Sequence, residues 1–320
     1  MISTGLIKGI QEAEERIRGY IRETPLEYSP FLSRLGGAHV SLKLENLQVS
    51  GSFKARGVFN KLLSYKDSSK LFVTASSGNH GVAFAYVTTL LGLKGLVFLP
   101  ENVSPAKVQD IMLYSVGVRF HGRDTVETEA HARKYAEVSE AIYVSPYNDF
   151  EVIAGQGTVG VELVKQLRSF DAVLVPVGGG GLISGIAVYL KNVAPEVRVV
   201  GVQPENSAVM YHSLKAGRIL SMESKPTLAD GVAGGIEENS VTFELCRRYV
   251  DEFILVNEEE IANAIKLMLE KHHMLIEGSS ALSIAAYLKN PTIYKNKKII
   301  LLVTGCRIDL KTLRKILKIR

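Results

Sequence analysis

A single lysine lies among small and polar residues in the segment SGSFKARG, which covers residues 50–57. A lysine amine acts as a nucleophile or a base when its surroundings favour the neutral form. The segment alone does not separate that role from ordinary surface charge. What Lys54 does therefore depends on the groups that the rest of the chain supplies.

Four consecutive glycines follow a continuous apolar run and precede a helical pattern; they are Gly178, Gly179, Gly180 and Gly181, with Leu182 next. Glycines allow successive backbone N–H groups to point toward one position, and a helix N-terminus adds positive potential. Neither the G-x-G-x-x-G fingerprint of dinucleotide sites nor the Walker GK[ST] sequence occurs here. The segment therefore predicts a cradle for a small phosphate monoester.

The segment ASSGNHG at 75–81 also falls between a predicted strand and a predicted helix. Its polar groups at a helix start are suited to binding a carboxylate, and they belong to Ser76, Ser77, Gly78, Asn79 and His80. Read alone, a capped helix without a ligand is the simpler interpretation. Together with a phosphate cradle and an isolated lysine, the segment fits pyridoxal phosphate, whose aldehyde reacts with a lysine and whose amino-acid substrates bring a carboxylate.

The elements that must position these segments alternate between strand and helix. Apolar runs cover 71–75, 95–100, 116–122 and 141–146, and then 171–177, 197–203, 252–257 and 298–305. Helical patterns between them include 79–91, 258–272 and 279–288. This alternation predicts an α/β fold of two doubly wound lobes with mainly parallel sheets, with the active site in the cleft between the lobes. We expect a large domain at 1–68 and 147–320 and a small domain at 69–146.

The composition is that of a globular protein. Of 320 residues, 46% are hydrophobic and 22% are charged, and the net charge is +5, which argues against disorder. The basic C-terminal segment favours a solvated amphipathic helix over a nucleic-acid-binding arm. Two cysteines and seven histidines show no metal-ligand spacing, and neither a signal peptide nor a membrane span is evident. We expect a cytoplasmic protein that binds no metal, nucleic acid or membrane.

In this order, the segments SGSFKARG, SSGNHG, VGGGG and TGCRID resemble those of the fold type II pyridoxal-phosphate-dependent enzymes, most closely the threonine/serine dehydratases and serine racemases. The resemblance runs from ETPL at 23–26 to TGCRID at 304–309. It implies a fold like that of the tryptophan synthase β subunit, pyridoxal 5′-phosphate as cofactor and a small amino acid as substrate. It also implies a homo-oligomer, either a dimer or a tetramer.

The resemblance implies a role for each matching residue. Lys54 would hold the cofactor through a Schiff base and remove the substrate α-proton, with Phe53 beside the ring. The loop from Ser76 to His80 would bind the substrate carboxylate, with Asn79 on the ring hydroxyl oxygen. The cofactor phosphate would be held by Gly178, Gly179, Gly180, Gly181 and Leu182, and the rest of the ring would face Gly231, Glu277 and Thr304.

Several positions depart from the family pattern. Thr304 replaces a serine and keeps its hydroxyl, whereas Cys306 and Arg307 replace a glycine and an asparagine and change the bulk and charge near the ring. Gln203 and Val209 stand where serine racemases place the two acids of a divalent-metal site. Because neither side chain binds a hard cation as a carboxylate does, we expect no magnesium dependence through that site.

The leading hypothesis is dehydration and deamination of L-threonine or L-serine to a 2-oxo acid and ammonia. A neutral hydroxyl facing the ring nitrogen gives a weaker electron sink, which suits elimination better than transamination. The alternative is racemisation, in which Ser77 would act as acid and base on the face opposite Lys54. Two further possibilities are a dehydratase of another β-hydroxy amino acid, such as 3-hydroxyaspartate, and a cofactor-free binding protein with the same fold.

Overall fold

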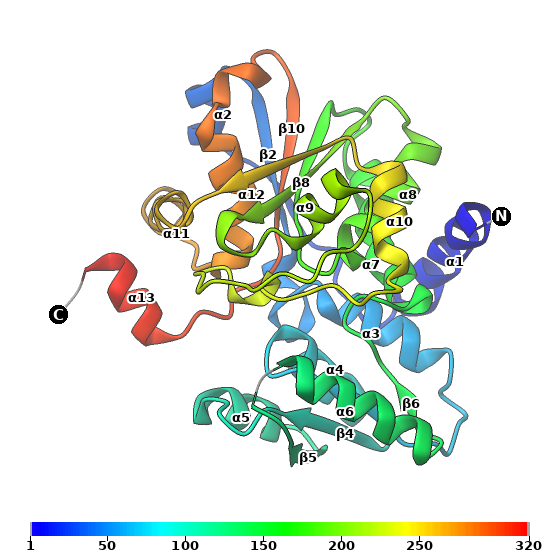
Figure 1. The fold of residues 1–320 in the computed structure, drawn as a ribbon. Coiled ribbons are helices and arrows are strands. Elements are labelled where there is room, and N and C mark those ends of the chain that lie inside the picture. The colour runs from blue at the N-terminus through cyan, green and yellow to red at the C-terminus, as the bar shows by residue number, and fades with distance from the viewer. Residues whose placement is uncertain (1, 124, 319–320) are drawn as a thin grey trace.

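The computed structural model describes residues 2–123 and 125–318, whose strands form a six-stranded and a four-stranded sheet (Figure 1). In spatial order, the strands of the larger sheet are β1 (Leu26–Tyr28), β2 (His39–Leu44), β10 (Lys298–Val303), β7 (Ala172–Pro176), β8 (Arg198–Pro204) and β9 (Glu252–Val256). The edge strand β1 pairs antiparallel with β2, and the other neighbours pair in parallel.

The smaller sheet is parallel throughout. Its strands, in spatial order, are β5 (Gly117–Phe120), β4 (Gly95–Leu99), β3 (Phe72–Ala75) and β6 (Ile142–Tyr143). The expected α/β class with mainly parallel sheets is therefore confirmed. Strand pairing does not define where a domain begins or ends, so the boundaries at 68/69 and 146/147 stay a prediction.

Helices connect and cover the strands. In the first half of the chain they are α1 (Ile2–Ile17), α2 (Pro30–Gly36), α3 (Lys54–Leu63), α4 (Asn79–Leu90), α5 (Pro105–Met112), α6 (Thr125–Val138) and α7 (Phe150–Gln166). In the second half they are α8 (Gly181–Val193), α9 (Val209–Ala216), α10 (Val241–Tyr249), α11 (Glu258–His272), α12 (Gly278–Lys289) and α13 (Leu310–Leu317). The helical patterns at 79–91, 258–272 and 279–288 thus match α4, α11 and α12.

Strand β10 shows why its sequence is apolar at every position. Ile299 and Leu301 belong to a hydrophobic cluster that includes residues of α11 and α12. Ile300 and Leu302 belong to a second cluster that includes residues of α8. Side chains alternate across a strand, so a strand covered on both faces needs apolar residues throughout.

Helices α3 and α7 pack with their backbones in close contact. A Cβ on Gly57 would lie 2.8 Å from the carbonyl O of Val152, and a Cβ on Gly155 would lie 2.7 Å from the Cα of Gly57. Only glycine allows such an approach. Because α3 ends at Leu63 and α7 begins at Phe150, the stretch that forms the smaller sheet begins and ends at two adjoining helices.

Strand β2 was not identified from the sequence, because a lysine lies in its buried interior. Lys43 Nζ lies 2.5 Å from Glu162 Oε2. Arg56 Nη1 lies 2.8 Å from Glu162 Oε1, and Arg56 Nη2 lies 2.7 Å from Glu45 Oε1. These four side chains are fully buried and compensate one another's charge, as buried ions must. Arg56 lies on α3 two residues after Lys54, so the cluster holds the first turn of this helix in place.

The C-terminal segment forms the expected helix, α13. Asp309 accepts from Thr312 N–H at 2.9 Å and caps its N-terminus. Ile316 packs into one of the clusters of the larger sheet. Within 2–123 and 125–318, no helix is long and apolar enough to span a membrane.

Candidate active site

Two loops meet at the carboxyl end of β10 and place Lys54 there. Phe53 N–H donates to the carbonyl O of Thr304 at 3.1 Å, and Ser52 forms a β-bridge with Gly305. Helix α3 then begins at Lys54. The segments SGSFKARG and TGCRID are therefore neighbours at a strand end, where α/β sheets bind ligands.

The Lys54 side chain is half-buried, and its amine is hydrogen-bonded within the chain. It donates to the carbonyl O of Pro146 at 2.9 Å and lies 5.2 Å from the centroid of the Phe53 ring. Desolvation lowers the pKa of Lys54 to about 8, although the carboxylates of Glu129 and Glu277 act in the opposite direction. Because only the neutral amine is a nucleophile or a base, this environment makes Lys54 reactive near neutral pH.

The pH dependence of Lys54 labelling should report this environment. In cofactor-free protein, labelling by pyridoxal phosphate and borohydride should rise with pH and reach half its maximum at about 8, because the neutral amine attacks the aldehyde. Peptide mapping by mass spectrometry across the neutral and alkaline range gives the midpoint. A midpoint near 10.4, the value of a lysine in a model peptide, would contradict the desolvation argument.

The glycine run forms a tight turn between β7 and α8, against the ring of Tyr147. Gly180 has a φ of +86°, and a Cβ on Gly179 would collide with the Tyr147 ring. Thr242 Oγ1 donates to the carbonyl O of Gly179 at 2.6 Å. Helix α8 begins at Gly181, and the first N–H groups of a helix have no partner within it. The turn therefore has the geometry of a backbone anion site.

A half-buried amide at the start of α4 and a buried carboxylate just before α12 are hydrogen-bonded to each other. Asn79 Nδ2 donates to both carboxylate oxygens of Glu277, at 2.8 and 2.9 Å, and Arg307 N–H donates to Glu277 Oε2 at 2.9 Å. Burial raises the pKa of Glu277 to about 7, against the effect of these donors. Asn79 Oδ1 is buried and has no hydrogen-bond partner among the described residues. This oxygen is available to a ligand.

Two further residues of the predicted site, Thr304 and Gly231, lie close to Glu277 or to the serines that follow it. Thr304 Oγ1 and Ser280 Oγ are 3.1 Å apart and share a hydrogen bond. A Cβ on Gly231 would lie 2.8 Å from Ser279 Oγ and 3.8 Å from Glu277 Oε1. Sequence reasoning missed Ser279 and Ser280, although both stand in the EGSSA segment directly after Glu277.

The loop between β3 and α4 uses its residues in two different ways. Ser76 Oγ accepts from Gly78 N–H at 3.3 Å within the loop. His80 is buried instead, with Nε2 at 3.0 Å from Thr74 Oγ1 and 3.1 Å from the carbonyl O of Val144. Burial lowers the pKa of His80 to about 3. Its ring supports the smaller sheet, so carboxylate binding, which stays a prediction, would depend on the other groups of the loop.

The two residues that depart most from the family pattern lie beside this site. Cys306 is half-buried, and its Sγ lies 3.5 Å from the carbonyl O of Gly51. Arg307 Nη1 lies 2.7 Å from Asp110 Oδ2 on α5. The positive charge that Arg307 introduces is therefore paired with a carboxylate from the part of the chain that carries the smaller sheet.

Gln203 and Val209 are the two positions that were compared above with the metal site of serine racemases. Both polar atoms of the Gln203 side chain form hydrogen bonds within this chain. Its Nε2 donates to the carbonyl O of Val177 at 3.2 Å, and its Oε1 accepts from Tyr211 N–H at 2.8 Å. Val209 is buried in a hydrophobic cluster. Among the described residues, no group of three or more His, Cys, Asp or Glu side chains could hold a metal ion. The expected independence from magnesium stays a prediction.

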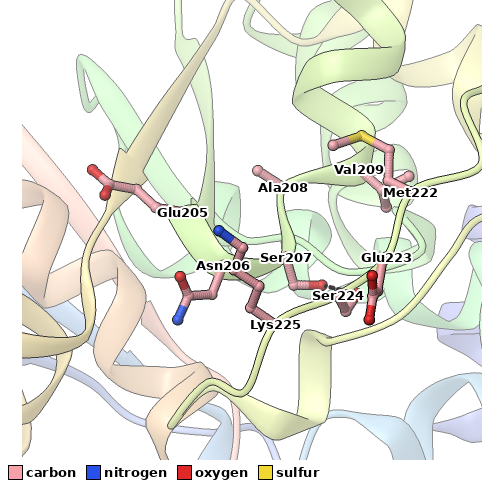
Figure 2. A pocket seen from close by; sticks show the side chains of 9 residues that line it. All are labelled: Glu205, Asn206, Ser207, Ala208, Val209, Met222, Glu223, Ser224 and Lys225. Carbon is pink, nitrogen blue, oxygen red and sulfur yellow. Dashed lines mark hydrogen bonds between the residues drawn. The ribbon is translucent and has the colours of Figure 1, made fainter.

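A pocket lies just beyond Gln203 in the chain (Figure 2). Residues 205–209 and 222–225 line it, and Ser207 and Ser224 share a hydrogen bond of 2.8 Å there. No residue of the predicted site contributes to this lining. The pocket is therefore separate from the predicted site.

Known proteins resemble this chain in both sequence and structure. The family model described as "Pyridoxal-phosphate dependent enzyme" matches residues 17–305. The L-threonine ammonia-lyase of Thermotoga maritima is 40% identical over 97% of this chain and 78% of that protein. The beta-hydroxyaspartate dehydratase of Paracoccus denitrificans is 37% identical over 94% of this chain and 96% of that protein. The structure of maize serine racemase matches with a TM-score of 0.90 and 31% identity, covering 98% of this chain and 96% of that one.

Proposed function

Because this chain belongs to the family of pyridoxal-phosphate dependent enzymes, we propose that it is a threonine/serine ammonia-lyase. It converts L-threonine or L-serine into a 2-oxo acid and ammonia. The observation that carries the proposal is the hydroxyl of Thr304, which is bonded to the neutral Ser280 at the position that the family resemblance gives to the ring nitrogen. A neutral partner there does not hold the ring nitrogen protonated, which favours elimination over transamination.

The residues around Lys54 fit the cofactor, which when bound supplies an aldehyde for amines and an electron-withdrawing ring. The glycine turn would hold the phosphate through its backbone, because Tyr147 leaves no room for a side chain at Gly179. The unpartnered Asn79 Oδ1 would bond with the ring hydroxyl. The Lys54 amine, with its lowered pKa, would react with the aldehyde.

Lys54 also holds the proton that the reaction moves. With a pKa of about 8, its amine can accept the α-proton of the substrate and release it again near neutral pH. Backbone and hydroxyl groups of the 76–79 loop would orient the substrate carboxylate above it. Dehydration releases the β-hydroxyl of the substrate as water. The dehydrated product takes up one water when it hydrolyses, so the net products are the 2-oxo acid and ammonia.

Two other reactions have a specific observation for or against them. Racemisation, with Ser77 as the second acid and base, is supported by the similarity to serine racemase. Dehydration of 3-hydroxyaspartate would need a cation for a second substrate carboxylate. Arg307, which lies beside the site, is already paired with Asp110, which places this reaction lower despite the similarity to a dehydratase of that substrate.

A panel of β-hydroxy amino acids tests the proposal. Holoenzyme is incubated with L-threonine, L-serine or 3-hydroxyaspartate, and ammonia, 2-oxo acid and inverted amino acid are measured in the same samples. We expect equal amounts of ammonia and 2-oxo acid from L-threonine or L-serine, with less inversion. More D-serine than pyruvate from L-serine would favour a racemase, and fastest turnover of 3-hydroxyaspartate would favour that substrate. A colourless protein that borohydride does not change would indicate a cofactor-free binding protein.

We also propose that the protein is cytoplasmic and forms a homo-oligomer, either a dimer or a tetramer. The family resemblance supports the oligomer. Size-exclusion chromatography with light scattering measures the oligomeric state directly.

A further inference from the structure

Helix α5 carries two opposite charges on one face, and each forms an ion pair with a loop of the larger sheet. Lys107 and Asp110 are three residues apart, so they lie on the same side of the helix. Lys107 Nζ lies 3.1 Å from Asp230 Oδ2, and Asp110 Oδ2 lies 2.7 Å from Arg307 Nη1. We refer to these two ion pairs as the α5 contacts.

Both partners of α5 stand next to the candidate active site. Asp230 immediately precedes Gly231, at the start of the 3-10 helix η4 (Asp230–Val232). Arg307 donates its backbone N–H to Glu277 at 2.9 Å, and its Nη2 donates to the carbonyl O of Ser50, in the loop before α3, at 3.3 Å. Arg307 therefore connects α5 with two segments that surround the catalytic lysine.

The other side of α5 packs against α4. Ile111 is fully buried in a hydrophobic cluster that also contains Val82 and residues further along α4. A Cβ on Gly81, in the first turn of α4, would lie 3.3 Å from Ile111 Cδ1 and would collide with the carbonyl O of Ser76. The position of α5 is thus transmitted by close packing to the loop that is proposed to hold the substrate carboxylate.

We propose that Arg307 is a positioning residue for the reaction: through the α5 contacts it holds the 76–79 loop against the segments around Lys54. This inference rests on the proposed function. When the Arg307–Asp110 pair is broken, the loop spends less time in its binding position, and the apparent affinity for substrate falls by the same fraction. KM therefore rises, while kcat changes little because the reacting groups stay as they are.

The exposure of the α5 contacts suits a contact that breaks and forms during turnover. The side chains of Arg307 and Asp110 are 31% and 46% exposed, and those of Lys107 and Asp230 are 45% and 61% exposed. Ion pairs with this exposure add little to folding stability and are screened by salt. Their effect falls on the position of α5 rather than on whether the chain folds.

Charge exchange tests the pair. In holoenzyme, Arg307→Asp and Asp110→Arg should each raise KM for the best substrate of the panel by about fivefold, because each brings like charges together. The double exchange should recover most of the loss, and steady-state kinetics of the four proteins form a double-mutant cycle. Asp110→Asn, a mild change on an exposed helix face, should raise KM in the same direction and keeps the test decisive if Arg307→Asp fails to fold.

A matched control is the exposed pair of Arg198 and Glu252, at the amino ends of β8 and β9, opposite the site. Exchanging these charges should leave KM unchanged. Added salt should raise the KM of the unaltered protein and have a smaller effect on Asp110→Asn. An unchanged KM in both single exchanges, or a double exchange as impaired as the two singles combined, would overturn the proposal.

Hydrogen exchange separates this inference from the proposed function. In cofactor-loaded protein without substrate, the amides of α5 should exchange several-fold faster in Asp110→Asn than in the unaltered protein. If no amino acid yields ammonia but α5 exchanges faster as expected, the proposed function fails and the contact stands. If ammonia is released but α5 exchange and KM do not respond to Asp110→Asn, the positioning role alone is refuted.

Discussion

Replacing Lys54 with alanine is expected to lower kcat for ammonia release by about 10³-fold or more, in the upper part of the range for a positioned general base. In the proposed function, Lys54 is both the covalent anchor of the cofactor and the base that takes the α-proton, a role that its lowered pKa of about 8 favours. Borohydride should no longer attach the cofactor to the chain. Ammonia release and the intact mass after borohydride treatment measure the two effects.

The matched control is Lys66→Ala, which removes an exposed lysine just beyond α3. Its turnover and its borohydride product should equal those of the unaltered protein. Circular dichroism of both variants verifies that they are folded. Full turnover in Lys54→Ala would remove Lys54 from the mechanism, whatever the geometry around it.

The largest effect on stability is expected at the buried ion cluster. Replacing Arg56 with leucine should lower the free energy of unfolding by about 3–5 kcal/mol, because the carboxylates that it binds would stay buried without it. Those carboxylates belong to Glu45 and Glu162, and all three side chains are fully buried. Denaturant titration followed by circular dichroism measures the loss. The exposed Arg198 provides the control, since Arg198→Leu should cost no more than about 1 kcal/mol.

The contribution of this cluster to the free energy of unfolding should decrease at low pH. Burial alone would raise the pKa of Glu162, but Arg56 and Lys43 outweigh burial and lower the pKa to about 2. A glutamate in an unfolded chain has a pKa of about 4.3. The stabilisation is therefore complete above that pH and is lost as the pH falls through 2. An Arg56→Leu protein as stable as the Arg198→Leu control at neutral pH would contradict this account.

The strand ends allowed the positions of several candidate site residues to be predicted from the sequence. Gly178–Gly181 and Thr304 each follow an apolar run whose composition already indicates a strand buried on both faces, and such strands end at one edge of a parallel sheet. The loop after β3 follows the same rule. Local patterns of this kind depend on neighbours within a few residues, so they can be read along the chain.

The pairings that complete the site could not be read in this way. Asn79 and Glu277 are 198 residues apart, and Arg307 and Asp110 are 197 apart, so no local period connects them. The direction of the His80 ring depends on Thr74 and on the backbone carbonyl of Val144, just beyond β6. Strand β2 was not predicted because it contains Lys43. A buried lysine is acceptable in a strand only when a carboxylate pairs with it, and this carboxylate belongs to Glu162, far away in the sequence.

Because Gly57 and Gly155 bring α3 and α7 into backbone contact, the stretch between these helices leaves and rejoins the rest of the chain at nearly one place. Stretches with adjacent ends are the ones that tolerate exchange between related proteins. This stretch contains the 76–79 loop, whereas Lys54 and the glycine turn lie outside it. Under the proposed function, this stretch supplies the loop for the substrate carboxylate and the Asn79 contact with the cofactor ring, whereas the reactive amine and the phosphate cradle are inherited with the rest of the chain.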